Sequence, residues 1–274
     1  MPELPEVETV VRSLAPLIRG REISGARLRL EKLIRRPAAF ELDALAGRRI
    51  LDVSRRGKMV RISVEGGLSL VFHLKMTGQL LARPAAEPLD KHTHFCLAFR
   101  DDGAELRFRD VRKFGFLACL RTAEMAASKE FAGLGPEPLE TGREAFAALF
   151  RGRRGRTKSL LLDQRVIAGI GNIYADEALF AARIHPLTGA VRLRTSDLDR
   201  LWRETRRVLR RAIAARGTSV SDYRDAEGLE GDFQERLRVY GRAGEPCPRC
   251  GTPIRRIVVG GRGTHFCPRC QRRC

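Results

Sequence analysis

The sequence predicts an α+β protein with a strand-rich N-terminal part, a helical part and a small metal-binding finger. Between about residues 23 and 120, short apolar runs alternate with glycine-containing turns, as in an antiparallel sandwich or barrel. Beyond residue 140 the apolar residues recur with helical spacing. Near the C-terminus, two Cys-x-x-Cys pairs stand in sequence. With the stretch 133–138, rich in Gly and Pro, as a linker, we expect domains at 1–130, 131–236 and 237–274.

Individual elements follow from local patterns. A first helix is expected over Glu6–Ile18, because its apolar residues share one face, and Gly20 ends it. The strand signals are Ile50–Val53, Met59–Val64, Leu68–Leu74, Phe95–Phe99 and Glu105–Phe108. The later helices are expected at Arg143–Phe150, Leu160–Asp163, Asn172–Ala182, Ser196–Ala215 and Phe233–Val239.

Composition points to a polyanionic partner. The 274 residues carry a net charge of +19, and the pI is about 10.8. Residues 151–274 hold 27 Lys and Arg against 13 Asp and Glu, so this half carries most of the excess. Such a basic half favours nucleic acid as the partner. There is no apolar run near 18 residues and no basic-then-apolar leader, so we expect a cytoplasmic protein without a membrane span.

The N-terminus offers an unusual nucleophile. Removal of Met1 would leave Pro2 with a free secondary α-amine. An α-amine has an ordinary pKa of about 7.7–8.0, so part of it is neutral and nucleophilic at neutral pH. Such an amine attacks an aldehyde-level carbon to give a Schiff base. Glu3 and Glu6 supply carboxylates nearby for proton transfer. The alternative is that these residues simply begin a solvated helix, with Glu6 in its first turn.

Four cysteines have the spacing of a tetrahedral zinc site. The run Ile254–Val259 and the glycine-rich turn at 260–263 lie between the two pairs, so we expect a β-hairpin finger whose tip presents Arg262. A redox or chance pair of Cys-x-x-Cys motifs is the alternative. Since no ligand position is left open, we expect one structural Zn²⁺. Its ligands would be Cys247, Cys250, Cys267 and Cys270, whereas Cys96, Cys119 and Cys274 lie outside the pattern and form no disulfide framework.

Two further stretches suggest contacts with DNA. Gly169 and Gly171 immediately precede a helix that begins near Asn172, and a helix N-terminus binds anions. A plain helix–turn–helix joint is the alternative. The segment 110–115 carries a basic pair, an aromatic residue and a glycine, a composition suited to a wedge inserted into a duplex. Phe114, and Met76 in the segment 73–78, are candidate wedges, although either could be a core residue.

The motifs together resemble the formamidopyrimidine-DNA glycosylase family over essentially the whole chain. The motifs that carry the resemblance are residues 2–9, 55–58, 73–78, 91–94, 110–115, 163–177, 239–242 and the four-cysteine finger. The resemblance implies an N-terminal antiparallel β-sandwich domain flanked by helices and a C-terminal helix–two-turn–helix domain with a β-hairpin zinc finger. It implies a monomeric base-excision-repair enzyme that acts on double-stranded DNA containing oxidised bases or abasic sites.

The resemblance also implies roles for individual residues. The enzyme would excise oxidised purines such as 8-oxoguanine and formamidopyrimidines, and then cleave the strand by β,δ-elimination as an AP lyase. Pro2 would be the nucleophile, Glu3 the acid that helps to open the sugar, Lys58 a group for β-elimination and Arg262 one for δ-elimination. Glu6 would be a supporting acid. DNA-binding residues would be His73, Met76, His92, Arg112, Phe114, Arg153, Lys158 and Asn172.

Two alternative functions stay open. An endonuclease VIII-type glycosylase would act on oxidised pyrimidines, but Leu4 and the Arg112–Phe114 stretch favour the purine-specific type. A zinc-finger protein that binds lesions without cutting them would not need a free proline amine. Thr93 and Met59 depart from residues common in the family, and neither is a proposed catalytic group. We expect the glycine-containing segment Gly217–Asp232 to cover the flipped base.

Overall fold

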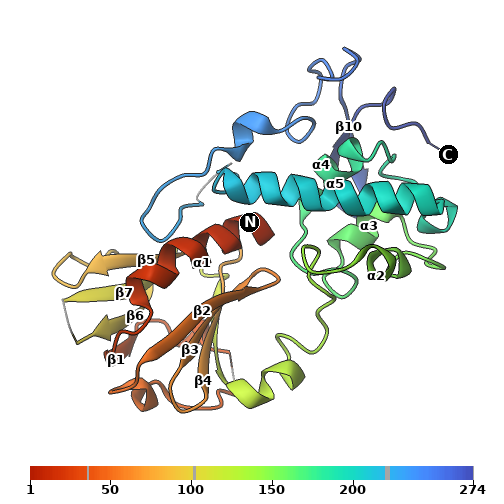
Figure 1. Cartoon of the computed structure of the whole chain (residues 1–274). Coiled ribbons are helices and arrows are strands. Elements are labelled where there is room, and N and C mark those ends of the chain that lie inside the picture. Colours follow the sequence, from red (N-terminus) through yellow and green to blue (C-terminus); the bar gives the residue numbers. More distant parts are fainter. Residues whose placement is uncertain (36, 101–102, 220–222, 274) are drawn as a thin grey trace. The chain divides into compact units, whose positions relative to one another are not determined.

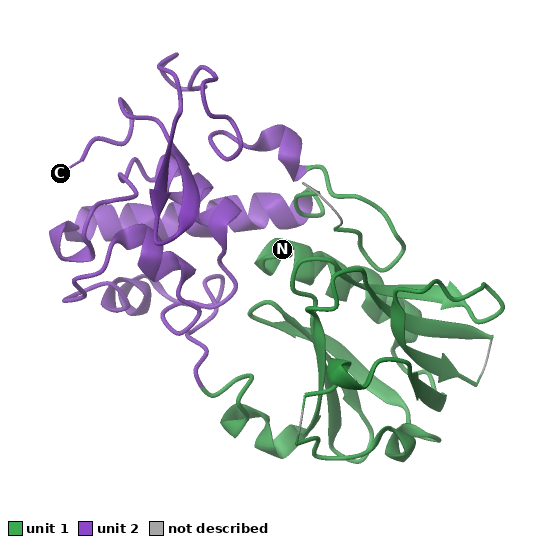
Figure 2. Cartoon of the chain, turned by 180° about the vertical axis from the view of Figure 1, so that it is seen from behind, with its two compact units in different colours: residues 1–132, 215–232 green, residues 133–214, 233–274 purple. Residues whose placement is uncertain are grey.

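The computed structural model describes residues 1–35, 37–100, 103–219 and 223–273. The chain divides into two compact units, coloured separately in Figure 2. Unit 1 contains Met1–Ala132 and Ala215–Asp232, and unit 2 contains Gly133–Ala214 and Phe233–Cys274. The chain therefore returns to unit 1 after the long helix of unit 2, and the expected base-covering segment is packed in unit 1. Its residues 220–222 lie outside the described part, as does Cys274.

Unit 1 contains two antiparallel four-stranded sheets (Figure 1). One sheet has the order β1-β6-β7-β5 and the other has the order β2-β3-β4-β8. Consecutive strands β2, β3 and β4 pair through short turns, and β8 completes the sheet by pairing with β4. The strands are β1 Ile23–Leu28, β2 Ile50–Arg56, β3 Met59–Val64, β4 Leu68–His73, β5 Gly78–Pro84, β6 Thr93–Phe99, β7 Ala104–Asp110 and β8 Phe116–Arg121.

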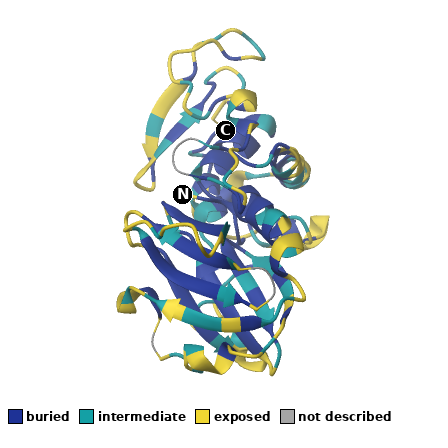
Figure 3. Ribbon diagram, turned by 90° about the vertical axis from the view of Figure 1, so that its left-hand side faces the viewer, coloured by how far each residue is buried: buried dark blue, intermediate teal, exposed yellow. Residues whose placement is uncertain are grey.

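The core of unit 1 lies between the two sheets. The ring of Phe72 on β4 lies 5.7 Å from that of Phe95 on β6 and 5.6 Å from that of Phe108 on β7, centroid to centroid. All three side chains are fully buried. Tilted aromatic pairs at this separation stabilise a core beyond their burial alone. Figure 3 shows the strands of unit 1 as largely buried and the connecting turns as exposed. The predicted antiparallel β-sandwich is thus confirmed.

Helix α1, Leu4–Ile18, packs against this sandwich. Its apolar side chains Val7, Val10 and Leu14 are completely buried and belong to the same core as the sheets. The helix begins two residues earlier than the sequence pattern predicts. The reason is a reciprocal cap in which the Glu3 carboxylate accepts the Glu6 N–H and the Glu6 carboxylate accepts the Glu3 N–H.

Unit 2 is built mainly of helices. Within it α4 packs against both α3 and α5, and α2 packs against α5. The longest, α5, places leucines and other apolar residues on one face, and Leu201 and Leu209 are completely buried. The helices are α2 Arg143–Ala148, α3 Thr157–Leu162, α4 Asn172–Ala181 and α5 Thr195–Ala214. The expected helix Phe233–Val239 is only a 3₁₀ turn, η5 Phe233–Arg236.

The C-terminal finger of unit 2 contains the expected hairpin. Strand β9, Arg255–Val259, pairs antiparallel with β10, Arg262–Phe266. Gly260 and Gly261 form the two-residue turn with φ of +57° and +73°, a conformation that glycine adopts without strain. Short 3₁₀ turns complete the described chain: η1 Glu31–Leu33, η2 Leu42–Leu45, η3 Thr122–Ala127 and η4 Ala190–Arg192. In the described residues, none of the helices combines the length and apolar character that crossing a membrane requires.

Candidate functional site

The N-terminal residues form a buried group at the start of α1. Pro2 is buried, Glu3 is 3 % exposed and Glu6 is 2 % exposed, whereas Met1 is 47 % exposed. Oε2 of Glu6 accepts the backbone N–H of Glu3 at 2.8 Å, which fixes the backbone next to Pro2. The carboxylates are therefore not a solvated helix start. They hold the residue that carries the candidate nucleophile.

The other carboxylate oxygen of Glu6 binds a segment more than 200 residues away. Oε1 accepts the backbone N–H of Thr218 at 2.8 Å. The hydroxyl of Tyr223 lies 3.2 Å from the carbonyl oxygen of Glu6. Burial and the neighbouring Glu6 charge raise the pKa of this hydroxyl, so it remains a hydrogen-bond donor at neutral pH. The sequence predicted Glu6 as a site residue, whereas it gave no indication of Tyr223.

Lys58 stands in the tight turn between β2 and β3 and is 7 % exposed. The residue before it, Gly57, has φ +58°. Its carbonyl accepts a hydrogen bond from Arg55 at 3.0 Å, and Arg55 also binds the Glu8 carboxylate of α1 at 3.0 Å. Glu8 and Arg55 thereby fix the turn that presents Lys58 relative to α1, which also carries the N-terminal group.

His73, at the end of β4, is a neutral hydrogen-bond acceptor. Burial, together with the positive charges of Lys75, Lys58 and Arg35, lowers its pKa to about 3. Its Nδ1 accepts the backbone N–H of Lys75 at 3.0 Å. The His73 side chain therefore orders the turn that leads to Met76. The Lys58 charge contributes to the lowered pKa of His73.

Three predicted DNA-binding residues lie together on the surface of unit 1. Met76 is 42 % exposed and Phe114 is 56 % exposed, so neither is a core residue. An Arg112 guanidinium nitrogen lies 3.1 Å from the Met76 sulfur, and the guanidinium carbon lies 4.9 Å from the Phe114 ring centroid. We call Met76, Arg112 and Phe114 the exposed triad. A methionine and an aromatic ring held by an arginine suit insertion into a base stack.

Asp110 organises the loop that carries the exposed triad. Its side chain is completely buried, and Oδ2 accepts the backbone N–H of Gly115 at 2.7 Å. Oδ1 accepts the Thr77 hydroxyl and, at 3.2 Å, the backbone N–H of Arg112. A Cβ at Gly115 would come within 2.6 Å of the Phe108 ring, so this close approach requires glycine. This aspartate belongs to one of the sequence motifs, but no role was expected for it.

His92 lies in the turn before β6. Its backbone N–H donates to Asp90 Oδ1 at 3.0 Å, and its carbonyl accepts the N–H of Asp110 at 2.9 Å. Burial pushes the pKa of Asp90 up, but hydrogen bonds from Arg109 and Thr93 outweigh it and hold the pKa at about 2. Asp90 is therefore ionised and fixes the turn. The buried Nδ1 of His92 has no hydrogen-bond partner among the described residues.

Lys158 and Asn172 meet the zinc hairpin inside unit 2. The Lys158 side chain is completely buried, with Nζ 2.6 Å from Asp176 Oδ1 and 2.7 Å from the Thr264 hydroxyl. Asn172 Nδ2 donates to the Gly263 carbonyl at 2.9 Å, and Lys158 Nζ lies 3.3 Å from the same oxygen. Both residues therefore hold the start of β10. Asn172 is the first residue of α4, as expected, and Gly171 is its N-cap.

Two of the predicted basic residues of unit 2, Arg153 and Arg262, are exposed. Arg262 is exposed at the hairpin turn, directly before the anchored Gly263. Arg153 is exposed ahead of α3. Asp176 also accepts the backbone N–H of His265 at 2.8 Å. The hairpin backbone is thus fixed at Gly263 and His265, just after Arg262. Asp176 belongs to the sequence motif 163–177, but no role was expected for it.

A second buried acid holds the chain that leads into the finger. Glu177 accepts the backbone N–H groups of Arg238, Val239 and Tyr240 at 2.9–3.1 Å. Burial raises the pKa of Glu177, although these hydrogen bonds oppose the shift. Three successive N–H groups bound to one carboxylate fix the segment before the first cysteine pair. Adjacent acids of α4, Asp176 and Glu177, therefore position both the hairpin and the segment that leads into the finger.

The four predicted zinc ligands converge. Their sulfur atoms all lie within 4.8 Å of one another, and the separations are 4.0 Å for Cys247–Cys270 and 3.5 Å for Cys250–Cys267. Four thiolates at such separations suit one tetrahedral Zn²⁺ with no open coordination position. The four residues are Cys247, Cys250, Cys267 and Cys270, and they form a structural zinc site.

In unit 1 the structure groups the N-terminal residues, and the Glu8–Arg55 link fixes the Lys58 turn relative to their helix. The exposed triad is a second group in the same unit. Unit 2 groups Lys158 and Asn172 with the residue next to Arg262. The link between Glu6 and the segment 215–232 was not foreseen, because no local sequence pattern joins residues so far apart.

Comparisons with known proteins cover all parts of the chain. Three family descriptions match: the formamidopyrimidine-DNA glycosylase N-terminal domain at 1–117, its H2TH domain at 134–224, and a zinc finger found in FPG and IleRS at 244–273. A formamidopyrimidine-DNA glycosylase of Solibacter usitatus is 51 % identical over 274 residues and matches all of both chains.

Solved structures of the same family are also similar to this chain. The MutM (Fpg) protein of Thermus thermophilus has a TM-score of 0.88 and 44 % identity and covers all of both chains. A mutant of Lactococcus lactis Fpg, in complex with DNA containing Fapy-dG, has a TM-score of 0.91 and 36 % identity, with 99 % of this chain and 100 % of that chain covered. Identity this high over the whole length goes beyond a shared fold. The chain belongs to the formamidopyrimidine-DNA glycosylase family.

Proposed function

We propose that this protein is a base-excision-repair DNA glycosylase and AP lyase that removes oxidised purines from double-stranded DNA. The observation that carries the proposal is the buried N-terminal group, in which Glu3 and Glu6 fix the backbone beside Pro2. Family membership supports it, as does the relative from Lactococcus lactis that binds DNA containing Fapy-dG. The net charge of +19 suits a polyanionic substrate.

The proposed chemistry begins with the free amine of Pro2 once Met1 is removed. The amine attacks the sugar C1′, the bond from C1′ to the damaged base breaks, and Glu3 gives a proton to help open the sugar ring. The product is a Schiff base that acidifies the hydrogens on C2′. Loss of a C2′ proton then expels the 3′ phosphate, and a second elimination expels the 5′ phosphate. We assign Lys58 to the first elimination and Arg262 to the second.

The remaining predicted residues would bind the DNA. A base must leave the stack before its glycosidic bond can be reached, and the exposed triad is suited to fill the space that it leaves. His73 would order the turn before Met76. His92 and Arg153 would contact phosphates, together with Lys158 and Asn172. Since Lys158 is buried beside Asp176, we propose that it acts mainly by holding the hairpin that carries Arg262.

We further propose three functional domains with the boundaries expected from the sequence: 1–130, 131–236 and 237–274. The packing of residues 215–232 on unit 1 would then be a contribution of the middle domain to the catalytic one. We propose that the enzyme acts as a monomer in the cytoplasm and is associated with the nucleoid when it is bound to DNA.

The decisive experiment traps the Schiff base. The protein is incubated with a duplex carrying 8-oxoguanine opposite cytosine, and borohydride is added to reduce the imine to a stable adduct. We expect one covalent protein–DNA adduct that maps to Pro2. A chain that keeps residues ahead of Pro2 has a tertiary amide there and should form none. The matched control is Pro5→Ala, which changes a proline of the same helix start but leaves the α-amine intact.

The outcomes separate the alternatives. Lesion binding without an adduct or strand cleavage would overturn the enzymatic proposal in favour of a lesion-binding protein. An adduct formed with an oxidised pyrimidine but not with 8-oxoguanine would keep the mechanism and reassign the substrate to the endonuclease VIII type. An adduct that maps to Lys58 instead of Pro2 would overturn the assignment of the nucleophile.

A further inference from the structure

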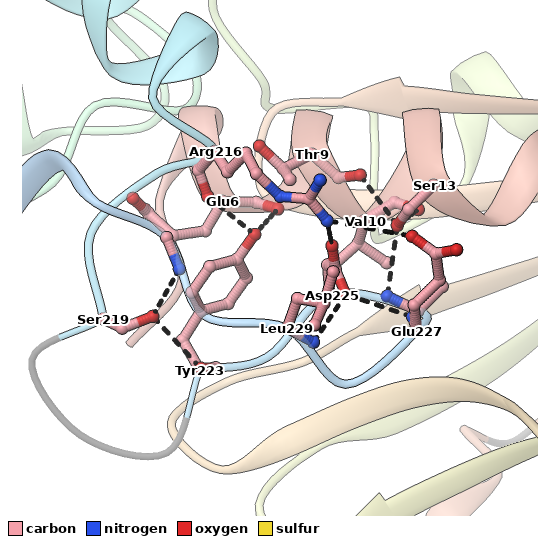
Figure 4. Close-up of polar contacts among 12 residues, drawn as sticks. Glu6, Thr9, Val10, Ser13, Arg216, Ser219, Tyr223, Asp225, Glu227 and Leu229 are labelled. Atoms are coloured by element: carbon pink, nitrogen blue, oxygen red, sulfur yellow. Dashed lines mark hydrogen bonds and ion pairs between the residues drawn. The ribbon is translucent and has the colours of Figure 1, made fainter.

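The segment 215–232 is fixed to unit 1 by more than its contact with Glu6. Asp225 is 1 % exposed and forms an ion pair with Arg216, whose side chain is 42 % exposed (Figure 4). The same carboxylate accepts the backbone N–H groups of Glu227 at 3.1 Å and Leu229 at 2.9 Å. A buried carboxylate with these partners is rigidly held, and its hydrogen bond and charge raise the pKa of Arg216.

The turn that contains Asp225 is itself attached to the sandwich. The backbone N–H of Ala226 donates to the Ser13 hydroxyl of α1 at 3.1 Å. Its carbonyl accepts the backbone N–H of Ala82 on β5 at 3.1 Å, and Ala226 is completely buried. Asp225 thus stands on a fixed part of unit 1. The ion pair with Asp225 therefore holds Arg216 in place where the chain enters the segment.

The entry to the segment has a strained and crowded backbone. Arg216 has φ +59° and Gly217 has φ +83°, so two successive residues are left-handed. This conformation is costly for a non-glycine residue such as Arg216 and persists only where its surroundings enforce it. A Cβ at Gly217 would lie 2.8 Å from Glu6 Oε1, so the backbone passes directly over the Glu6 carboxylate. Contacts with other residues must therefore hold Arg216 in this conformation.

Hydrogen bonds join the two sides of the segment next to this entry. Tyr223 Oη lies 3.2 Å from the carbonyl oxygens of both Glu6 and Arg216. The Ser219 hydroxyl donates to the Tyr223 carbonyl at 3.2 Å and accepts the Gly231 N–H at 2.9 Å. We call Arg216, Thr218, Ser219, Tyr223 and Asp225 the neck of the segment.

We propose that Asp225 and Arg216 are a positioning pair for base excision. Their ion pair fixes the neck over Glu6 and so sets where the base-covering segment stands relative to Pro2 and Glu3. This inference rests on the proposed function. Neither residue touches the reacting atoms. If the segment covers the flipped base as the sequence predicts, excision needs it in place, whereas cleavage at an abasic site has no base to hold, so the two steps would depend differently on the pair.

The test compares those two steps in one variant. Asp225→Asn keeps the shape of the side chain and its acceptor oxygen for Glu227 and Leu229, but it removes the ion pair. A misplacement on the order of 1 Å can cost roughly 100-fold in rate. We expect single-turnover excision of 8-oxoguanine to fall about 10- to 100-fold by that measure, with strand cleavage at a preformed abasic site within about twofold of the parent protein.

Two further variants make the result specific. Arg216→Gln removes the same ion pair from its half-exposed partner and should show the same selective loss, which covers the case in which Asp225→Asn folds poorly. Asp199→Asn removes a carboxylate from an ion pair with Arg143 that lies outside the segment, and it should change neither step.

The outcomes distinguish this inference from the proposed function. If the parent protein excises 8-oxoguanine but the Asp225→Asn and Arg216→Gln variants lose both activities equally, or lose neither, the positioning role is overturned. If the parent protein itself neither excises the base nor cleaves at an abasic site, the proposed function fails instead.

Discussion

Nζ of Lys158 lies 2.6 Å from Oδ1 of Asp176, and both side chains are completely buried. Bringing two charges out of water is costly, and their attraction compensates for this cost only when the geometry is good and the remaining donors are satisfied. Thr264 and Gly263 supply the further acceptors for Lys158. The pair therefore serves to place the hairpin, which carries Arg262, on α4.

Removal of one partner of this pair should destabilise the protein strongly. Asp176→Asn leaves the Lys158 ammonium buried without its counter-ion, and we expect the free energy of unfolding to fall by roughly 3–5 kcal/mol. The measurement is urea unfolding followed by circular dichroism. The control is Asp199→Asn, which breaks the exposed pair with Arg143 and should cost no more than about 1 kcal/mol. Equal losses in the two variants would contradict the anchoring role.

Loss of zinc should release the finger. Cys247→Ser removes one of the four thiolates, and structural zinc sites contribute directly to folding, so we expect loss of the metal and of DNA affinity. Metal analysis should give one Zn²⁺ per chain for the parent protein and less than one for the variant. Cys119→Ala, at a buried position on β8 outside the cluster, should retain one Zn²⁺. A Cys247→Ser variant with a full complement of zinc and unchanged affinity would show that the site is not structural.

Sequence patterns predicted the elements whose causes are local. Helical spacing of apolar residues indicated α1, and the Cys-x-x-Cys spacing with Gly260-Gly261 indicated the hairpin finger. The strand Met59–Val64 was predicted with its observed bounds. The start of α1 was misplaced because Glu3 and Glu6 cap each other, a reciprocal contact that periodicity does not show.

Relationships between distant residues could not be read in this way. The family resemblance implied that Lys158 binds DNA, yet its side chain is buried, and its partners are 18 residues away at Asp176 and 106 residues away at Thr264. In the same way, the attachment of Tyr223 to Glu6 depends on the tertiary fold of unit 1. Sequence chemistry therefore identified reactive residue types, whereas the buried acids that position them required the structure.

The exposed triad should contribute to DNA binding and not to stability. Phe114 is 56 % exposed, so Phe114→Ala should change the free energy of unfolding by no more than about 0.5 kcal/mol. Stacking of an aromatic ring on a base contributes about 1–3 kcal/mol, so affinity for lesion-containing duplex should fall roughly 5- to 150-fold. Fluorescence anisotropy measures the affinity. The control, Phe108→Ala in the core, should instead lose about 3–5 kcal/mol of stability. Unchanged affinity in Phe114→Ala would rule out a stacking role.

Buried His73 should make the protein less stable as the pH falls. Its pKa is about 3 in the folded protein against 6.5 ordinarily, because of burial and the nearby lysines and arginine. The unfolded chain takes up a proton below pH 6.5 and the folded protein does not, so the stabilising contribution is complete above pH 6.5 and is lost progressively toward pH 3. The slope is at most about 1.4 kcal/mol per pH unit.

The measurement is the free energy of unfolding between about pH 6.5 and pH 5 for the parent protein and for His73→Gln. Glutamine has no proton to gain in this range, so the variant should lack this component of the slope even if its stability at neutral pH is lower. The difference between the two slopes isolates His73, because every other titrating group is common to both proteins. Identical slopes would mean that His73 takes up its proton as readily in the folded protein as in the unfolded chain, against the environment made by Lys58, Lys75 and Arg35.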